Sequence, residues 1–260
     1  MRLKRAALFV GVSISRTLRA DLSFFADTAV GLVCMLVVHG LQISAFWLLL
    51  RQLSPGSLVP YLGQQGAMIV AWGALGVGFD GLRRLSLAIE NGEIESFLAT
   101  PLPPLLVASA SASSVVALAD VFFGLVLLGL TAWFDPVLAL LGLACVPMAF
   151  FTFAALFTLG AAASLLMRRG GALSDFLVFT TFTLSSLPSA AAFQGKARLL
   201  LYLCPALFTA YLPYESLASA SGWALPLGTG ASMALLWLSS RLFTHALGRA
   251  EFSSVARLRR

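Results

Sequence analysis

The most regular feature of this chain is a series of long apolar stretches separated by short polar segments. Six of these stretches are long enough to cross a bilayer as helices, which takes about 20 apolar residues each. They cover residues 28–50, 61–82, 105–132, 137–167, a fifth from residue 171 to between 188 and 193, and 223–247. The pattern therefore predicts an all-α polytopic membrane protein with six transmembrane helices, in a single transmembrane domain that spans residues 1–260.

Residues 2–19 carry a different pattern, in which apolar and basic residues alternate with a helical period. Apolar side chains recur at spacings of three and four and would line one face, with basic side chains on the opposite face. The apolar set is Leu3, Ala7, Val10, Ile14 and Leu18, and the basic set is Arg5, Arg16 and Arg19. Such a helix is predicted to lie in the headgroup plane rather than to span the membrane. The alternative is an ordinary lead-in to the first span.

One apolar segment, residues 199–212, is too short to be a span. It has only fourteen residues, is flanked by Lys196 and Arg198, and is interrupted by Pro205. A bilayer crossing needs about 20 residues, and a seventh crossing would also place the basic C-terminus on the opposite side. We therefore expect residues 194–222 to form an outer re-entrant helical hairpin between spans five and six, capped by Pro213. A break of this kind is tolerated only against protein or a water-filled cavity.

Composition excludes a soluble protein. Of the 260 residues 59% are hydrophobic and only 11% are charged, and the mean hydropathy is +0.93, far from the range of soluble domains. The net charge of +6 suggests attraction to anionic lipids rather than to nucleic acid, because no soluble fold is present to carry a basic patch. The three cysteines form no CxxC pair, so no disulfide framework or zinc site is expected, and residues 1–20 lack the features of a cleavable signal peptide.

The basic residues are distributed unequally between the two sides of the predicted membrane. With six crossings, fourteen of the seventeen Lys and Arg residues fall on the side of the termini, and only Arg51, Lys196 and Arg198 fall on the other. Loops rich in Lys and Arg remain in the cytoplasm. The chain is therefore predicted to be a multi-pass protein of the bacterial cytoplasmic (inner) membrane with both termini cytoplasmic.

Three glycines in the second stretch, Gly76, Gly78 and Gly81, match the GxGxxG fingerprint of dinucleotide-binding proteins. That fingerprint requires a preceding strand and a crossover unit, and neither is predicted here. Small residues in membrane helices let neighbouring backbones approach closely. We therefore interpret these glycines as packing positions.

Catalytic and metal-binding motifs are not found. The only lysines, Lys4 and Lys196, lack the context of a phosphate-binding loop, so the chain is not expected to hydrolyse ATP itself, and no GxSxG elbow occurs. The only histidines, His39 and His245, lack partners at metal-ligand spacing. The sequence thus predicts no enzyme, no catalytic residues and no metal site.

Two ionisable residues are predicted within the membrane, His39 near the middle of the first span and Asp120 near the middle of the third. Such groups mark functional sites by default, because burying them in lipid is costly. They would either pair with each other or line a polar pathway for a substrate. The alternative is that Ser and Thr hydroxyls inside the bundle satisfy each of them.

The most informative polar segment is the predicted cytoplasmic loop of residues 83–104. It holds three of the eleven acidic residues, Glu90, Glu93 and Glu95. After Gly92 a short helix is expected over residues 93–99, ended by Thr100 and Pro101. Its apolar residues Ile94, Phe97 and Leu98 share one face. A small apolar face rimmed by acids suits docking in a groove of another protein; the alternative is that this face packs on the chain's own helices.

Three segments together resemble the membrane permeases of type-2 ABC transporters, and most closely the short six-span half-permeases that include viologen-exporter-like proteins. The first is GEIESFLATPLP, residues 92–103, which is similar to the loop between spans two and three of that family. The second is residues 179–193 with Pro188, and the third is PALFTAYLPYESL, residues 205–217. Thr100 and Leu187 depart from the residues common in the family, which are arginine and tyrosine.

The resemblance implies a role and a set of partners. Two permeases, identical or a related pair, would assemble with two cytoplasmic ATPase subunits, which would hold the ATP and Mg²⁺. The 2–19 helix would be the elbow helix, the 93–99 helix the ATPase coupling helix, and Pro188, Pro205 and Pro213 would belong to an outer gate. The expected function is ATP-driven export. The alternatives are an ion-coupled secondary transporter, for which no inverted repeat is evident, and a non-enzymatic membrane assembly subunit.

Overall fold

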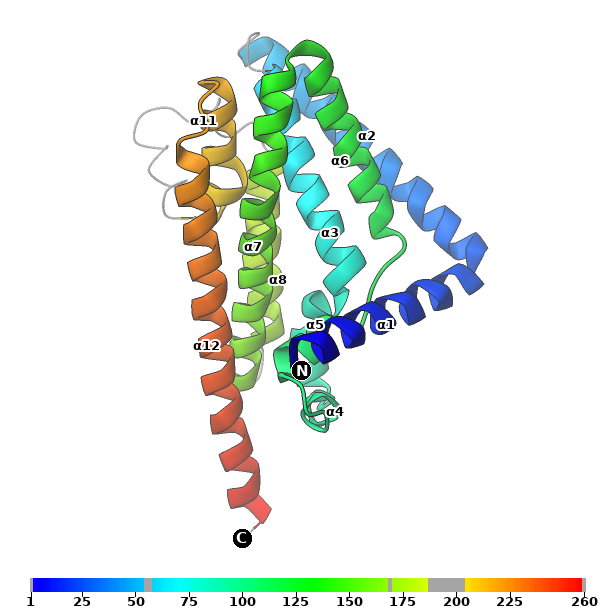
Figure 1. The fold of residues 1–260 in the computed structure, drawn as a ribbon, viewed down its shortest axis with the longest axis vertical. Coiled ribbons are helices and arrows are strands. Elements are labelled where there is room, and N and C mark those ends of the chain that lie inside the picture. The colour runs from blue at the N-terminus through cyan, green and yellow to red at the C-terminus, as the bar shows by residue number, and fades with distance from the viewer. Residues whose placement is uncertain (1, 54–57, 168–169, 187–203, 259–260) are drawn as a thin grey trace.

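The computed structural model describes residues 2–53, 58–167, 170–186 and 204–258, and these residues form helices and turns with no strand among them (Figure 1). Their order is α1 (Arg2–Ser23), α2 (Phe25–Leu53), α3 (Leu58–Glu90), α4 (Ile94–Leu98), α5 (Pro104–Ser109), α6 (Ala117–Phe134), α7 (Pro136–Leu166), α8 (Gly170–Ser186), η3 (Leu207–Tyr211), α11 (Leu212–Ala218) and α12 (Ala224–Leu258). The prediction of an all-helical protein is confirmed.

The core of the bundle lies around α7, which packs against α3, α8 and α12. The side chains of Phe153 and Met148 on α7 and of Met68 and Leu75 on α3 are completely buried. At the start of α7 the carboxylate of Asp135 accepts hydrogen bonds from the backbone nitrogens of Val137 and Leu138, at 2.9 and 3.2 Å. With this cap, and with Pro136 in the first turn of α7, a single residue connects α6 to α7.

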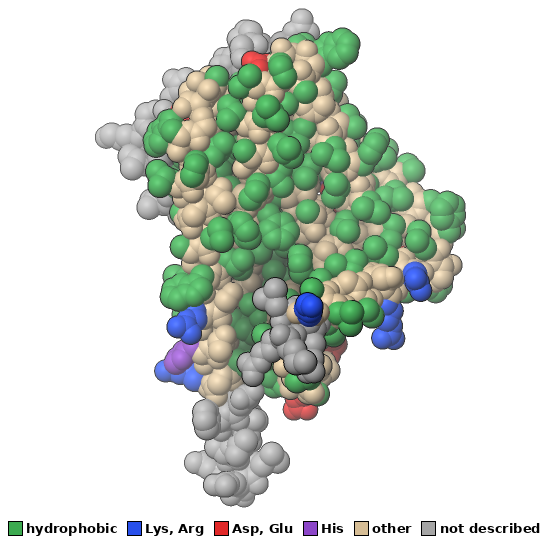
Figure 2. Space-filling view, viewed as in Figure 1, with side chains coloured by type: hydrophobic (Ala, Val, Ile, Leu, Met, Phe, Trp, Pro, Cys, Tyr) green, Lys and Arg blue, Asp and Glu red, His purple; other side chains and the backbone are tan. Residues whose placement is uncertain are grey.

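Three helices are long and apolar enough to cross a membrane within the described residues: α2 over Phe25–Ala45, α6 over Ala117–Phe134, and α7 over Pro136–Leu166. Large apolar side chains are exposed along them, as expected where helices face lipid. Figure 2 shows hydrophobic side chains over most of this face of the bundle, whereas the coloured Lys and Arg side chains lie near the end that carries α1. We call this the basic end.

The third apolar stretch was wrongly predicted to be one helix from residue 105. It forms α5, a non-helical break over residues 110–116, and then α6 from Ala117. The break lies against a kink in α3 at Phe79, where the backbone leaves the helical conformation. The Gly81 nitrogen donates to the Ala112 carbonyl at 3.2 Å, and the Ser114 nitrogen donates to the Gly76 carbonyl at 3.0 Å. The two irregularities thus satisfy each other's backbone groups, which makes both tolerable inside a membrane protein.

Helix α1 is separate from α2 and meets it at a corner near residue 24, at the basic end (Figure 1). The helix predicted over residues 2–19 therefore exists and extends to Ser23. At the corner the Asp21 carboxylate accepts a hydrogen bond of 3.0 Å from the backbone nitrogen of Val115, in the break before α6. Val116 lies so close to Gly31 of α2 that a Cβ there would come within 2.8 Å of it. Both ends of the α1–α2 corner are thus fixed to the break.

The segment before α12 also differs from the prediction. One π-helical turn, η3, continues directly into α11, and Pro213 is buried in the first turn of α11 rather than capping the end of a helix. Proline is tolerated in a first helical turn because its missing N–H has no partner to lose there. Pro205 lies in the turn that leads into this segment. Pro188 and residues 194–203 lie outside the described residues.

Candidate functional site

The turn between α3 and α4 is built on Gly92. This residue has φ of +80°, a conformation that glycine adopts without strain. The Gly92 nitrogen donates to the Ile89 carbonyl at 3.1 Å, and the Glu93 nitrogen donates to the Ala88 carbonyl at 2.8 Å. This is a Schellman motif. It fixes the direction in which the chain leaves α3 and so positions α4.

Helix α4 turns its apolar face toward the protein. Ile94, Phe97 and Leu98 are half-buried and pack against the core of the bundle. Glu93 and Glu95 are exposed, and Figure 2 shows acidic side chains at the tip of the basic end, where Figure 1 places α4. The sequence predicted the helix and the residues that share its face, and it left open whether that face packs internally. In this chain it does, and the surface presented outward is acidic. Pro101 is exposed after the helix.

Glu90, at the end of α3, has a partner that the sequence did not reveal. Its carboxylate accepts a hydrogen bond of 2.7 Å from the backbone nitrogen of Gly171, in the first turn of α8. A Cβ on Gly171 would lie 2.9 Å from the same carboxylate oxygen, so the two groups are in close contact. A carboxylate at a helix N-terminus is favourable because it satisfies a free N–H and complements the helix dipole. Glu90 therefore joins the end of α3 to the start of α8.

Replacing Glu90 with alanine is expected to loosen the first turn of α8. The loss should be about 0.5–2 kcal/mol, the range for removing a helix cap. Faster amide hydrogen exchange at the start of α8 would report it. Glu90→Gln keeps an acceptor oxygen and should restore most of the protection. Glu95→Ala, which removes an exposed carboxylate from α4, is the matched control, and equal effects of the two alanine variants would contradict the capping role.

A buried contact between two ionisable side chains joins α2 to α6. His39 Nε2 lies 2.8 Å from Asp120 Oδ1, both side chains are almost fully buried, and the imidazole stacks on Phe123 with ring centres 5.4 Å apart. The structure thus brings together the two intramembrane residues that the sequence singled out. Asp120 lies in the first turn of α6 rather than in the middle of a span, because the break shortens the helix. Among the residues that the structure describes, His39 Nδ1 and Asp120 Oδ2 have no hydrogen-bond partner.

A second group of charged side chains lies on α3, near its kink. The Arg83 guanidinium lies 4.1 Å from the ring centre of Trp72, within the range of a cation–π contact. Arg83 and Arg84 both contact the carboxylate of Asp80, at 3.4 and 2.8 Å. Arg84 remains largely exposed, whereas Arg83 is folded back along α3 toward Gly76. Asp80 therefore neutralises part of the positive charge at the kink.

The sequence matches a known protein family. The family model described as ABC-2 family transporter protein matches residues 56–254, which is most of the chain. The chain belongs to the ABC-2 transporter family. No curated protein and no solved structure matches it. As an ABC-2 protein it is a multi-pass membrane permease, and membership implies an ATPase subunit as its partner.

Two of the three GxGxxG glycines of this ABC-2 permease, Gly76 and Gly81, are packing positions. A Cβ on Gly81 would overlap the carbonyl oxygen of Ala108, and one on Gly76 would lie 2.6 Å from the Cβ of Ala117. Gly78 has no atom within 4 Å of its Cβ position. The described residues also hold no group of three or more His, Cys, Asp or Glu side chains that would bind a metal.

The ABC-2 permease has a second buried polar cluster, at the end opposite the basic end, which the sequence analysis missed. Gln64 and Gln65 of α3 donate to the Ser185 carbonyl at 2.9 and 2.8 Å, and the Tyr61 hydroxyl donates to the Ser186 carbonyl at 2.9 Å. Ser185 also hydrogen-bonds to Thr209 of η3. These bonds occupy the carbonyls of Ser185 and Ser186, the last two residues of α8, which have no partner within an ideal helix. Two adjacent glutamines inside a long apolar stretch were the available signal.

Proposed function

We propose that this chain is the permease subunit of an ATP-driven exporter in the bacterial cytoplasmic membrane. Two permeases, copies or relatives, would assemble with two ATPase subunits, which would hold the ATP and Mg²⁺. The six spans of this proposal are α2, α3, α6, α7, α8 and α12, and both termini would be cytoplasmic. Substrate would pass between the two permeases, and Pro205 and Pro213 would lie by the outer gate.

The charge distribution supports the orientation. Arg16 and Arg19 of α1, Arg83 and Arg84 of α3, and Arg241 and Arg249 of α12 belong to the side with fourteen of the seventeen basic residues. Positive residues next to membrane spans remain on the cytoplasmic side. The helix α1 meets α2 at a corner on that side (Figure 1), as an interfacial elbow helix would.

The observation that carries the ATP coupling is the way α4 is held. The Schellman turn at Gly92 fixes its start, and Ile94, Phe97 and Leu98 fix its apolar face against the core. ATP binding in a partner can bias the permease only through contacts that differ between two states. A helix fixed on its inner face transmits a push on its outer face, and that outer face carries Glu93 and Glu95. We therefore propose that the ATPase contacts the acidic face of α4.

The Glu90 contact with α8 extends this path. Because Glu90 lies at the end of α3 and caps α8, movement of α4 and its turn would reach two spans at once. Helices are rigid over many turns, whereas loops are not, so a direct cap is a better link than the long connection through α5, α6 and α7. This gives α8, the fifth proposed span, a mechanical connection to the ATPase side.

Charge reversal on α4 tests the proposal. In the variant Glu93→Lys/Glu95→Lys we expect the ATPase subunit to be lost from the purified complex, or its ATP hydrolysis to become independent of substrate. Insertion and thermal stability should be unchanged, because both side chains are exposed. Asp175→Lys/Asp27→Lys is the matched control, since both residues are exposed on other helices and the change in net charge is the same.

Two outcomes would contradict the proposal. If the native complex contains no ATPase subunit, a secondary transporter or an assembly subunit becomes the better description. If an ATPase is present but the α4 variant binds it and couples normally, the contact lies elsewhere on the chain.

A further inference from the structure

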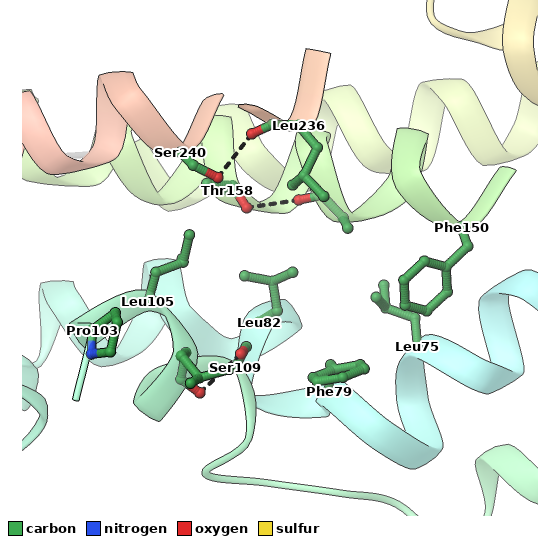
Figure 3. A pocket seen from close by; sticks show the side chains of 12 residues that line it. Leu75, Phe79, Leu82, Pro103, Leu105, Ser109, Phe150, Thr158, Leu236 and Ser240 are labelled. Atoms are coloured by element: carbon green, nitrogen blue, oxygen red, sulfur yellow. Dashed lines mark hydrogen bonds between the residues drawn. The ribbon is translucent and has the colours of Figure 1, made fainter. Parts of the chain in front are cut away.

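An apolar pocket of about 330 Å³ lies between two pairs of helices. Figure 3 shows its lining, with α3 and α5 on one side and α7 and α12 on the other. The main apolar lining residues are Leu75, Phe79, Leu82, Leu105, Phe150 and Leu236. The volume is within the range of small-molecule sites, about 300–1,000 Å³. The pocket is lined by different helices from those of the His39–Asp120 pair.

The kink in α3 accounts for the pocket. Phe79 lies where the backbone of α3 departs from the helix, and its ring contacts Phe150 of α7 edge-on, with centres 6.2 Å apart. Leu75 before the kink and Leu82 after it both line the pocket. The bent part of α3 is therefore one wall of the pocket.

The three hydroxyl groups in the lining already donate hydrogen bonds to backbone carbonyls. Ser109, Thr158 and Ser240 each donate to a carbonyl three or four residues earlier on their own helices, at 3.0, 2.8 and 2.8 Å (Figure 3). A bound polar molecule or water would find few partners, and ordered water needs two to four. An empty apolar space is also unfavourable, because its lining loses dispersion contacts. In a bilayer the available apolar filler is a lipid chain.

The position of the pocket indicates the headgroup. Two lining residues directly precede basic residues: Leu82 is followed by Arg83 and Arg84, and Ser240 is followed by Arg241. Arg241 is exposed, and its guanidinium lies 5.4 Å from the ring centre of Trp237. A lipid whose acyl chain enters the pocket from this end would leave its phosphate near the exposed Arg241, which favours an anionic lipid.

We propose that this pocket binds one acyl chain of an anionic phospholipid, with the headgroup at the level of Arg241. The chain would lie between α5 and α12 and so would support α5, the helix that directly follows α4. This site follows from the pocket and the basic residues alone. Failure of the lipid test would therefore leave the exporter assignment intact, and failure of the α4 test would leave this site intact.

Photolabelling tests the site directly. The full-length protein is reconstituted in vesicles of phosphatidylcholine that contain a small fraction of phosphatidylglycerol with a photoactivatable group on its acyl chain. We expect crosslinks on peptides from α5 and from residues 236–240 of α12. Ala154→Phe places a ring in the pocket from α7 and should lower this labelling about tenfold, a typical effect of misfit in an apolar pocket. Ala144→Phe, on the exposed face of the same helix, should leave it unchanged.

Two further variants complete the test. Leu236→Trp fills the pocket from a half-buried position, so it tests occupancy if Ala154→Phe fails to fold. With Arg241→Gln, the same photoactivatable chain on phosphatidylcholine and on phosphatidylglycerol should label α12 equally. Labelling of α5 and α12 that persists in both filled variants would overturn the site. A wild-type protein labelled equally by the two lipids would overturn the anionic preference.

Discussion

Replacing Gly81 with alanine is expected to destabilise the protein more than any other change of one methyl group at the kink. The added Cβ would overlap the Ala108 carbonyl and lie 2.6 Å from the Ser111 hydroxyl. The obstacle is mainly backbone, which cannot rotate away as the end of a side chain can. Overpacking of this kind costs about 1–3 kcal/mol or more. It would also separate the Gly81 nitrogen from Ala112, leaving backbone groups of the kink unpaired.

The measurement is the unfolding midpoint of the purified protein in detergent, together with the fraction that elutes as a folded monodisperse peak. Gly78→Ala is the matched control, because no atom lies within 4 Å of its Cβ position. Alanine favours a helix over glycine by up to about 1 kcal/mol, so this variant should be as stable as the parent or slightly more stable. Equal losses in the two variants would show that helix flexibility, and not packing against the break, matters at this position.

Asp120→Leu is the second change for which we expect a large effect. It would leave the His39 imidazole buried without a partner, next to Phe123. Removing one member of a buried ion pair costs about 3–5 kcal/mol in soluble proteins. Polar pairs between membrane helices are weaker, with measured couplings of about 0.6 and at most about 1.7 kcal/mol. Because α2 has few other buried residues, we expect a loss of about 1–2 kcal/mol that detaches α2 rather than unfolding the bundle.

A double-mutant cycle separates the pair from its surroundings. The variant His39→Leu/Asp120→Leu replaces both partners with apolar groups and should recover most of the stability lost in the single variant. Asp120→Asn keeps an oxygen that accepts from His39 and should be close to the parent. Accessibility of the exposed Cys34 on α2 to a thiol reagent reports whether α2 has moved. Additive effects of the two leucine changes would mean that the contact contributes nothing to holding α2.

The helices that the sequence predicted with success are those whose evidence is local. Long apolar runs predicted α2, α6 and α7, and Gly92 with Thr100 and Pro101 predicted the short α4. The break before α6 was missed because its alternating Ala and Ser residues have no strong preference against a helix. The break is stabilised by hydrogen bonds to Gly76 and Gly81 of α3. Such tertiary contacts produce no periodic pattern in the sequence.

The candidate site shows the same difference between features with a local sequence signal and features that depend on tertiary contacts. Periodicity correctly grouped Ile94, Phe97 and Leu98 on one face of α4, but it does not state which way a face turns, and the core of the bundle decides that. Glu90 looked like one more acid of the loop, although its partner lies 81 residues away at the start of α8. His39 and Asp120 were conspicuous as ionisable residues in apolar surroundings, so the sequence singled them out. It gave no information on the distance between their side chains.

The bend of α3 has a consequence for the synthesis and membrane insertion of the protein. A ribosome completes α3 before it makes Ala112 and Ser114, the residues that later occupy the backbone groups of Gly81 and Gly76. A nascent helix in lipid keeps its own hydrogen bonds while those partners are missing. We therefore expect the second apolar segment to enter the membrane as a straight helix and to acquire its bend afterwards. Maturation of this permease would then include a step in which an already inserted helix is reshaped by a later part of the same polypeptide.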